Sequence, residues 1–210
     1  SPAVEHFLYK EEDMEKKTEA YAVCAGTGKL YAAGYKRIVP YKNTVFLWTK
    51  YDSGQLRETE LGIVDDRGNM VKYSVCTVGN SVYVAAKEKV WKIDGSTVTP
   101  IAVSDKASGF DCMFVSGSDI LIASGGHIWK ITGTTAVLHK KLSSQRVIMD
   151  MCMHGTDLYA AGYYWEKRQG GIGYIYRPRW WKIASNGTGT VTEHELGTDE
   201  GEATGICVVQ

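Results

Sequence analysis

Hydrophobic and polar residues alternate along most of this chain, in short runs that are separated by small polar residues. The run from Val75 to Tyr83 is typical, with two alternating stretches around Gly79 and Asn80. Val, Tyr, Thr and Trp in such runs favour β-strands, and Gly, Asn and Asp between the runs favour tight hairpin turns. Only residues 11–20 have a locally helical pattern, and this stretch is short and polar. The pattern predicts an all-β protein.

The strand–turn–strand pattern is repeated along the chain. Its copies align at positions 24, 76, 114, 152 and 207, so the repeat recurs every 38 to 55 residues. Each full copy continues with a Trp followed closely by Lys, then a polar turn and one more strand, which gives four strands per copy. These landmark tryptophans are Trp48, Trp91, Trp129 and Trp181.

Four short antiparallel strands that repeat at this length are typical of a β-propeller blade. A β-sandwich would not place the landmark tryptophan at the same phase of every repeat, and the coils of a β-solenoid are usually shorter. We therefore predict one β-propeller domain over residues 1–210, with four full repeats and a partial fifth. The full repeats cover approximately residues 20–62, 71–104, 110–143 and 148–197, and the partial repeat covers residues 202–210.

The ends of the sequence leave the number of blades open. Residues 202–210 supply only a first strand, whereas Val4–Tyr9 resembles a fourth strand. A five-bladed ring with a reduced last blade, a four-bladed ring with an overlapping closure, and a segment of a longer propeller all fit. An open ring would expose unpaired strand edges, which favour self-association.

Four of the five cysteines occupy the same place in the first strand of their repeats, and Phe114 stands there in the third repeat. In a propeller this strand lines the central axis, where a small apolar side chain packs well. We expect buried thiols in preference to the alternative, a metal or redox cluster, because no Cys-x-x-Cys pair occurs. The landmark tryptophans are expected to fill the space between neighbouring blades. The aligned cysteines are Cys24, Cys76, Cys152 and Cys207.

Composition and motifs narrow the classes of function. The chain has 24 basic and 24 acidic residues, without the basic excess that is typical of nucleic-acid binders. No run approaches the about 18 apolar residues of a membrane span, and the sequence begins without a signal-peptide pattern. We also find no histidine pair at metal-ligand spacing, no nucleophile elbow and no phosphate-binding glycine loop before a helix. We therefore expect no cofactor, no metal, no nucleic-acid partner and no membrane span.

The first and fourth repeats have long connections between their second and third strands, at residues 35–43 and 163–180. In a closed ring both would rise from one side of one face. Their aromatic and basic side chains can stack on sugars, and the same residue types dominate protein-binding hot spots. The alternative is that these aromatic residues pack only on each other. The candidate ligand-binding residues are Tyr35, Arg37, Tyr41, Tyr163, Tyr164, Trp165, Arg168, Tyr176 and Arg179.

Two other functions compete with a non-enzymatic module that binds a glycan or a protein. Some five-bladed propellers are glycoside hydrolases, which use paired carboxylates near the axis. Asp150 is a weak catalytic candidate, because it shares a strand face with Cys152 but lacks a partner carboxylate at the equivalent inner positions. A structural scaffold is the third possibility. The equivalent inner residues are Ala22, Ser74, Cys112 and Gly205.

One sequence pattern carries a resemblance to known proteins. The segment Asp157–Tyr163, followed by Trp181, Lys182 and a turn with glycine, resembles the "YVAGY…YWKNG" repeats of bacterial cell-envelope propeller proteins. Lys29–Tyr35 shares the pattern, whereas the second and third repeats lack its Gly-Tyr ending. The resemblance spans most of residues 20–210 and implies a propeller in a secreted or cell-envelope protein, with a cytoplasmic protein as the alternative. It implies no activity, because fold alone does not define function.

Overall fold

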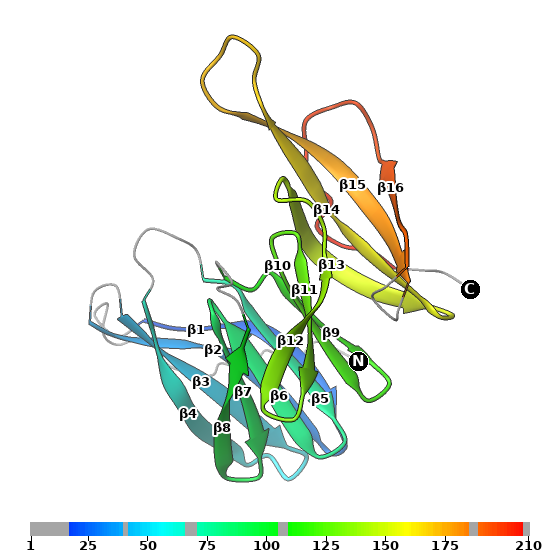
Figure 1. The fold of residues 1–210 in the computed structure, drawn as a ribbon. Coiled ribbons are helices and arrows are strands. Elements are labelled where there is room, and N and C mark those ends of the chain that lie inside the picture. The colour runs from blue at the N-terminus through cyan, green and yellow to red at the C-terminus, as the bar shows by residue number, and fades with distance from the viewer. Residues whose placement is uncertain (1–16, 40–41, 66–70, 105–108, 185–188, 208–210) are drawn as a thin grey trace, which may run out of the picture.

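In a computed structural model, which describes residues 17–39, 42–65, 71–104, 109–184 and 189–207, the chain forms sixteen β-strands and no helix (Figure 1). The prediction of an all-β protein is confirmed. The described residues accordingly contain no helix that is long and apolar enough to span a membrane. Residues 18–20, where a helical pattern was expected, belong to the first strand. Residues 11–16 and the expected fourth strand at Val4–Tyr9 lie outside the described residues.

The strands fall into four consecutive groups of four, which we call units one to four. Unit one contains β1 (Thr18–Gly26), β2 (Lys29–Val39), β3 (Lys42–Tyr51) and β4 (Leu56–Asp65). Unit two contains β5 (Tyr73–Val78), β6 (Ser81–Ala86), β7 (Lys89–Asp94) and β8 (Thr97–Val103). Unit three contains β9 (Cys112–Ser116), β10 (Asp119–Ser124), β11 (His127–Thr132) and β12 (Thr135–Lys141). Unit four contains β13 (Arg146–His154), β14 (Asp157–Lys167), β15 (Tyr174–Ala184) and β16 (Val191–Glu195).

Within each unit the strands pair antiparallel in chain order. Units one and four are separate four-stranded sheets, whereas units two and three share one eight-stranded sheet. The last strands of these two units, β8 and β12, pair in parallel with Ala102 opposite Thr135 and Val103 opposite Ala136. Backbone hydrogen bonds of 3.0 Å, from Ala102 N to Thr134 O and from Ser104 N to Ala136 O, make this link.

The hydrophobic core consists of three clusters, and each cluster lies between two consecutive units. In β10, Ile120 and Ile122 face the cluster shared with unit two, while Leu121 and Ala123 face the one shared with unit four. This alternation explains the continuous apolar run of β10, because a strand that is covered on both faces needs no polar side. The landmark residues Trp91, Trp129 and Trp181 each contribute to the cluster with the preceding unit, as expected from the sequence. Trp48 is also buried, but it belongs to none of the three clusters.

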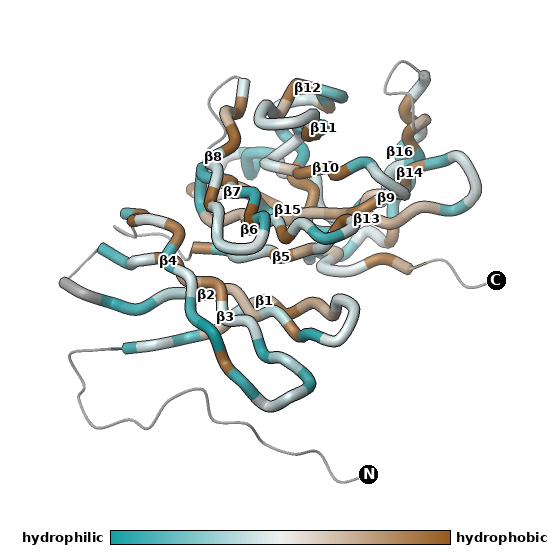
Figure 2. The backbone as a smooth tube through the Cα atoms, turned by 90° about the horizontal axis from the view of Figure 1, so that it is seen from below, coloured by the Kyte–Doolittle hydropathy of each residue, from teal (hydrophilic) through white to brown (hydrophobic). Residues whose placement is uncertain are grey.

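The first strands of the units lie next to one another in the middle of the molecule (Figure 2). Here β1 contacts β5, β5 contacts β9, and β9 contacts β13. The Sγ atom of Cys76 in β5 lies 3.0 Å from the Sδ atom of Met113 in β9. Burial raises the pKa of Cys24 to about 11 and that of Cys76 to about 12, so both thiols stay protonated at neutral pH. All five cysteines are free thiols, and the described residues contain no group of three or more metal-ligating side chains. Of the four aligned cysteines only Cys76 is buried, whereas Cys24 and Cys152 are partly buried and Cys207 is exposed, so the expectation of buried thiols is wrong for Cys207.

Units one and four differ from the other two by a bulge in their first strand. In unit four, Ile148 pairs with Gly162 and Asp150 pairs with the preceding Ala161, so Met149 is an extra residue. The bulge brings the backbone into close contact with the opposite strand. A Cβ atom at Gly162 would lie 1.9 Å from the carbonyl oxygen of Val147, which no side chain tolerates. Gly34 meets the carbonyl oxygen of Glu19 at the same distance in unit one. The shared Gly-Tyr ending of these repeats therefore accompanies a bulged first strand.

Candidate functional site

The hairpin of β14 and β15 projects beyond the rest of unit four (Figure 1). Its strands pair without interruption from Asp157 opposite Ala184 to Lys167 opposite Tyr174. Because side chains alternate across a strand, the outer part of the hairpin has two different faces. We call these the aromatic face, with Tyr163, Trp165, Tyr174 and Tyr176, and the charged face, with Tyr164, Glu166, Arg177 and Arg179.

The rings of the aromatic face pack edge to face in two pairs. The ring centroids of Tyr163 and Tyr176 are 5.2 Å apart, and those of Trp165 and Tyr174 are 5.0 Å apart. Burial, assisted by the negative charges of Glu202 and Asp111, raises the pKa of Tyr163 to about 12. The side chains of the aromatic face become more exposed toward the tip of the hairpin. Tyr174 is 44% exposed there, and Ile172 in the turn is fully exposed.

The arginines that connect the hairpin to the following segment are paired with acidic residues. Arg168 Nη2 lies 2.6 and 2.7 Å from the two carboxylate oxygens of Glu200. Arg177 donates from Nε to Glu166 Oε1 at 3.0 Å and from Nη1 to the carbonyl oxygen of Thr198 at 2.8 Å. These contacts hold the hairpin against residues 198–200 and compensate the charge of Arg168 and Arg177.

Arg179 is buried at the base of the charged face, with 6% of its surface exposed. It donates to Glu195 at 2.6 Å and lies 3.4 Å from Glu193, whose carboxylate also accepts a 2.7 Å hydrogen bond from Nε of Arg146. The guanidinium of Arg146 lies 5.8 Å from the ring centre of Tyr164. Arg179 therefore belongs to a network of ion pairs at the base of the hairpin, and Tyr164 contacts this network through Arg146.

The candidate residues of unit one lie in a different setting. Tyr35 is 5% exposed and belongs to the core between units one and two, where it donates a 2.8 Å hydrogen bond to Glu19. The guanidinium of Arg37 lies 5.9 Å from the ring centre of Tyr35. Tyr41 lies outside the described residues. The structure does not bring the hairpin of β2 and β3 together with that of β14 and β15, which lie in separate parts of the molecule (Figure 1). The candidate surface is thus confined to unit four.

Asp150, the weak catalytic candidate, contacts the C-terminal segment. Its Oδ2 atom accepts a 3.0 Å hydrogen bond from the backbone N–H of Ile206, and its Oδ1 atom accepts one of 2.9 Å from that of Met151. The other inner carboxylate, Asp111, accepts hydrogen bonds from Lys72 Nζ at 2.9 Å and from the N–H of Gly125 at 2.8 Å. Every oxygen of the two carboxylates thus has a donor within the chain, and this arrangement supports a structural role.

The C-terminal segment, residues 203–207, forms the same kind of backbone hydrogen bond to its preceding unit as units three and four do. The N–H groups of Phe110 and Ile148, four residues before aligned positions 114 and 152, donate to carbonyl oxygens of the preceding unit at 2.7 and 2.9 Å. Ala203, four residues before Cys207, donates in the same way to Gly162 at 3.2 Å. Residues 203–207 therefore contact unit four as the beginning of a next unit would.

Replacing Asp150 by alanine is expected to loosen this segment. The substitution leaves the N–H of Ile206 without its acceptor, which should cost about 1–3 kcal/mol and accelerate hydrogen exchange of that amide. Urea unfolding and residue-resolved hydrogen exchange measure the two effects. Asp119→Ala, which removes an exposed carboxylate paired with Lys130, is the control and should have little effect. Unchanged exchange at Ile206 would contradict the structural role of Asp150.

Comparison of the chain with known protein families finds no matching family, and a search of curated proteins finds no match. The function is therefore argued from the geometry of the chain itself. The sequence located the aromatic residues of unit four, but the acidic partners of its arginines were missed. Glu193, Glu195 and Glu200 are far from those arginines in the sequence, and no local pattern pairs them.

Proposed function

We propose that the four units are blades of a β-propeller and that residues 203–207 begin a fifth. The adjacent first strands, the core clusters between consecutive units and the repeated hydrogen bonds from Phe110, Ile148 and Ala203 support this arrangement. The direct pairing of β8 with β12 departs from a regular propeller, in which neighbouring blades are separate sheets.

We further propose that the chain is a non-enzymatic binding module that docks a protein partner through the tip of the β14–β15 hairpin. The observation that carries this proposal is the exposure of large apolar side chains on a projecting, internally braced hairpin. Ile172 is fully exposed, and Tyr174 and Tyr176 are 44% and 38% exposed. Adjacent exposed apolar residues mark interaction surfaces, and tyrosine and tryptophan dominate the binding energy of protein interfaces.

The pairing of the arginines also favours a protein partner. Arg168, Arg177 and Arg179 already have acidic partners, so an anionic ligand would have to displace a carboxylate. These ion pairs hold the hairpin in place along its length, from Arg179 at its base to Arg168 at its tip, and this lowers the entropic cost of binding. The resemblance of the repeats to cell-envelope propellers supports a secreted or envelope location for this encounter.

A glycan is the second candidate ligand, because the exposed rings of Tyr174 and Tyr176 can stack on the apolar faces of sugars. A glycan ligand would account for the exposure of the aromatic rings but would give the exposed Ile172 no role. The two ligand classes therefore predict different sensitivities. Docking of a protein depends on Ile172, whereas binding of a glycan depends on the rings alone.

The test uses a photo-crosslinking amino acid at position 172 to capture a partner, followed by affinity measurements with that partner in purified form. The double variant Ile172→Asp, Tyr174→Ala should bind at least about tenfold more weakly, because both side chains lie at the centre of the proposed contact. Val137→Asp is the matched control, since Val137 is 52% exposed on β12, away from the hairpin.

Three results would contradict docking of a protein. Equal affinity of the double variant and the control would remove the hairpin from the interface. A hit on a glycan array that Trp165→Ala abolishes and Ile172→Asp leaves intact would favour a glycan. Turnover of a glycoside that disappears in Asp150→Asn would favour the hydrolase alternative.

A further inference from the structure

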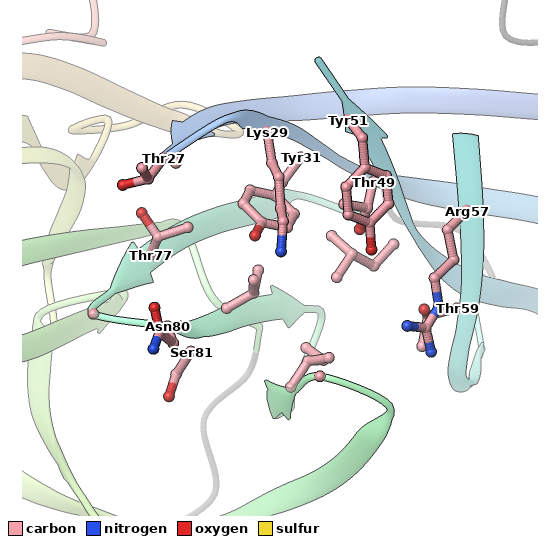
Figure 3. A pocket seen from close by; sticks show the side chains of 16 residues that line it. Thr27, Lys29, Tyr31, Thr49, Tyr51, Arg57, Thr59, Thr77, Asn80 and Ser81 are labelled. Atoms are coloured by element: carbon pink, nitrogen blue, oxygen red, sulfur yellow. The ribbon is translucent and has the colours of Figure 1, made fainter. Parts of the chain in front are cut away.

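A second candidate site lies between units one and two, at the end of the sheets opposite the long hairpins (Figure 3). It is a cleft of about 230 Å³ that lies beside the turns joining the first and second strands of these units. Its floor is apolar and is formed by Leu47, Val82 and Ile93, each of which is at most 4% exposed. The cleft is too small for a drug-sized ligand and has room for one small molecule or one unit of a larger one.

The walls of the cleft are rich in hydroxyl groups. Seven of the sixteen lining residues are threonine, serine or tyrosine. Tyr31 and Tyr51 extend from unit one, and Asn80 and Ser81 face them from unit two (Figure 3). Hydroxyl and amide groups over an apolar floor offer a polyol both hydrogen-bond partners and a surface for its C–H face.

The lining contains two cations, Lys29 and Arg57, and no carboxylate. The Nζ atom of Lys29 lies 5.0 Å from the ring centre of Tyr51. Within the described part of the chain, no carboxylate forms an ion pair with Lys29 or Arg57. Lys29 and Arg57 therefore lack the acidic partners that the arginines of unit four have. Asp94, whose carboxylate accepts a hydrogen bond from Ser81 in the wall, is itself paired with Lys92.

Alignment of the repeats shows that Lys29 is a departure from the pattern of units three and four. Asp119 and Asp157 stand at the equivalent position there, five residues after the aligned first-strand position. Each of them pairs with the landmark lysine of its own unit, Lys130 at 2.6 Å and Lys182 at 2.8 Å. Unit one has a lysine in place of the aspartate, and its charge is turned toward the cleft (Figure 3). This reversal adds a cation where two other units have an internal ion pair.

We propose that the cleft binds an acidic sugar, whose carboxylate is bound by Arg57 and attracted by the positive charge of Lys29. A guanidinium forms strong, directional hydrogen bonds with a carboxylate, and the lysine adds a second positive charge. The hydroxyl-bearing walls bind the sugar hydroxyls, and the apolar floor contacts the ring. This site is independent of the proposed docking of a protein, because it lies between units one and two and shares no residue with the hairpin of unit four.

The test titrates the purified chain with glucuronate, galacturonate and N-acetylneuraminate, and with glucose and galactose as neutral counterparts. Binding is followed by amide chemical shifts in two-dimensional NMR spectra. At least one acidic sugar should bind about tenfold or more tightly than the neutral sugars and shift the amides of residues 77–81. Arg57→Gln should weaken this binding about tenfold or more, the usual consequence of losing a charge-assisted hydrogen bond. Lys29→Gln should weaken it in the same direction.

Lys141→Gln is the matched control, because it removes an exposed cation from the end of β12 in unit three, outside the lining of the cleft, and should leave sugar binding unchanged. Thermal unfolding of each variant verifies that the fold is intact. The proposal is overturned if none of the three acidic sugars binds, if neutral sugars bind equally well, or if Arg57→Gln binds like the wild type. Inorganic sulfate that binds as tightly as the best acidic sugar would also overturn it, since the cleft would then recognise only the charge.

Discussion

Trp181→Ala is expected to lower the free energy of unfolding by about 3–5 kcal/mol, the usual cost of truncating a fully buried tryptophan. The ring of Trp181 has no exposed surface and lies in the core cluster between units three and four. Its loss would leave a cavity between two sheets, which the rigid backbones of β11 and β14 cannot fill. Urea unfolding followed by far-UV circular dichroism measures the change.

Its neighbour Trp180 provides the control. Trp180 is only partly buried, and it stacks on His194 with a centroid distance of 3.8 Å and an interplanar angle of 7°. Trp180→Ala removes a ring of the same size from the opposite face of β15, and the expected loss is smaller than for Trp181 because this ring is only partly buried. Equal losses in the two variants would show that burial between units does not set the importance of the landmark tryptophans.

The landmark tryptophans also show why much of the fold could be predicted from the sequence. Hydrophobic alternation and glycine turns act over a few residues, so strands such as β6 and β10 are visible locally. The recurrence of Trp91, Trp129 and Trp181 at one phase reflects a repeated environment, namely the cluster with the preceding unit. Repeated local patterns therefore carried information about packing between units.

Contacts that depend on tertiary geometry could not be predicted in this way. The parallel pairing of β8 with β12 involves only two residue pairs, and its strands look like any other fourth strand in the sequence. The burial of Tyr35 likewise depends on how the units pack together. In sequence it matches Tyr163, which lies in the projecting hairpin of unit four, but in the structure it is enclosed between units one and two. Similar local sequences thus occupy different surroundings.

The cleft between units one and two had a signal in the sequence that motif searches do not use. Lys29 interrupts a position that is acidic in units three and four, and such a reversal is visible once the repeats are aligned. No comparable signal in the aligned repeats points to Arg57. Its contribution depends on how the sheet of unit one packs over unit two, and only the structure places Arg57 in the same cleft as Asn80 and Ser81.

Gly162→Ala is expected to destabilise the chain by about 2–4 kcal/mol, although it adds a single methyl group. The new Cβ would lie 1.9 Å from the carbonyl oxygen of Val147 and 2.9 Å from its carbonyl carbon. Both contacts are with backbone, so a change of side-chain rotamer cannot relieve them. The bulged part of β13 must instead move away from β14. Urea unfolding measures the loss, and hydrogen exchange should show the largest increase in residues 146–150.

Gly201→Ala is the control for this prediction, because a Cβ at Gly201 would meet no atom within 4 Å and its cost should stay within about 0.5 kcal/mol. Gly34→Ala provides an independent repeat of the experiment, since its Cβ would meet the carbonyl oxygen of Glu19 at the same 1.9 Å in unit one. If the bulge is the cause, Gly34 and Gly162 should both be intolerant. A mild effect at Gly162 would mean that the bulge of β13 can relax, and that the glycine of the Gly-Tyr ending is not required by the close contact between the two strands.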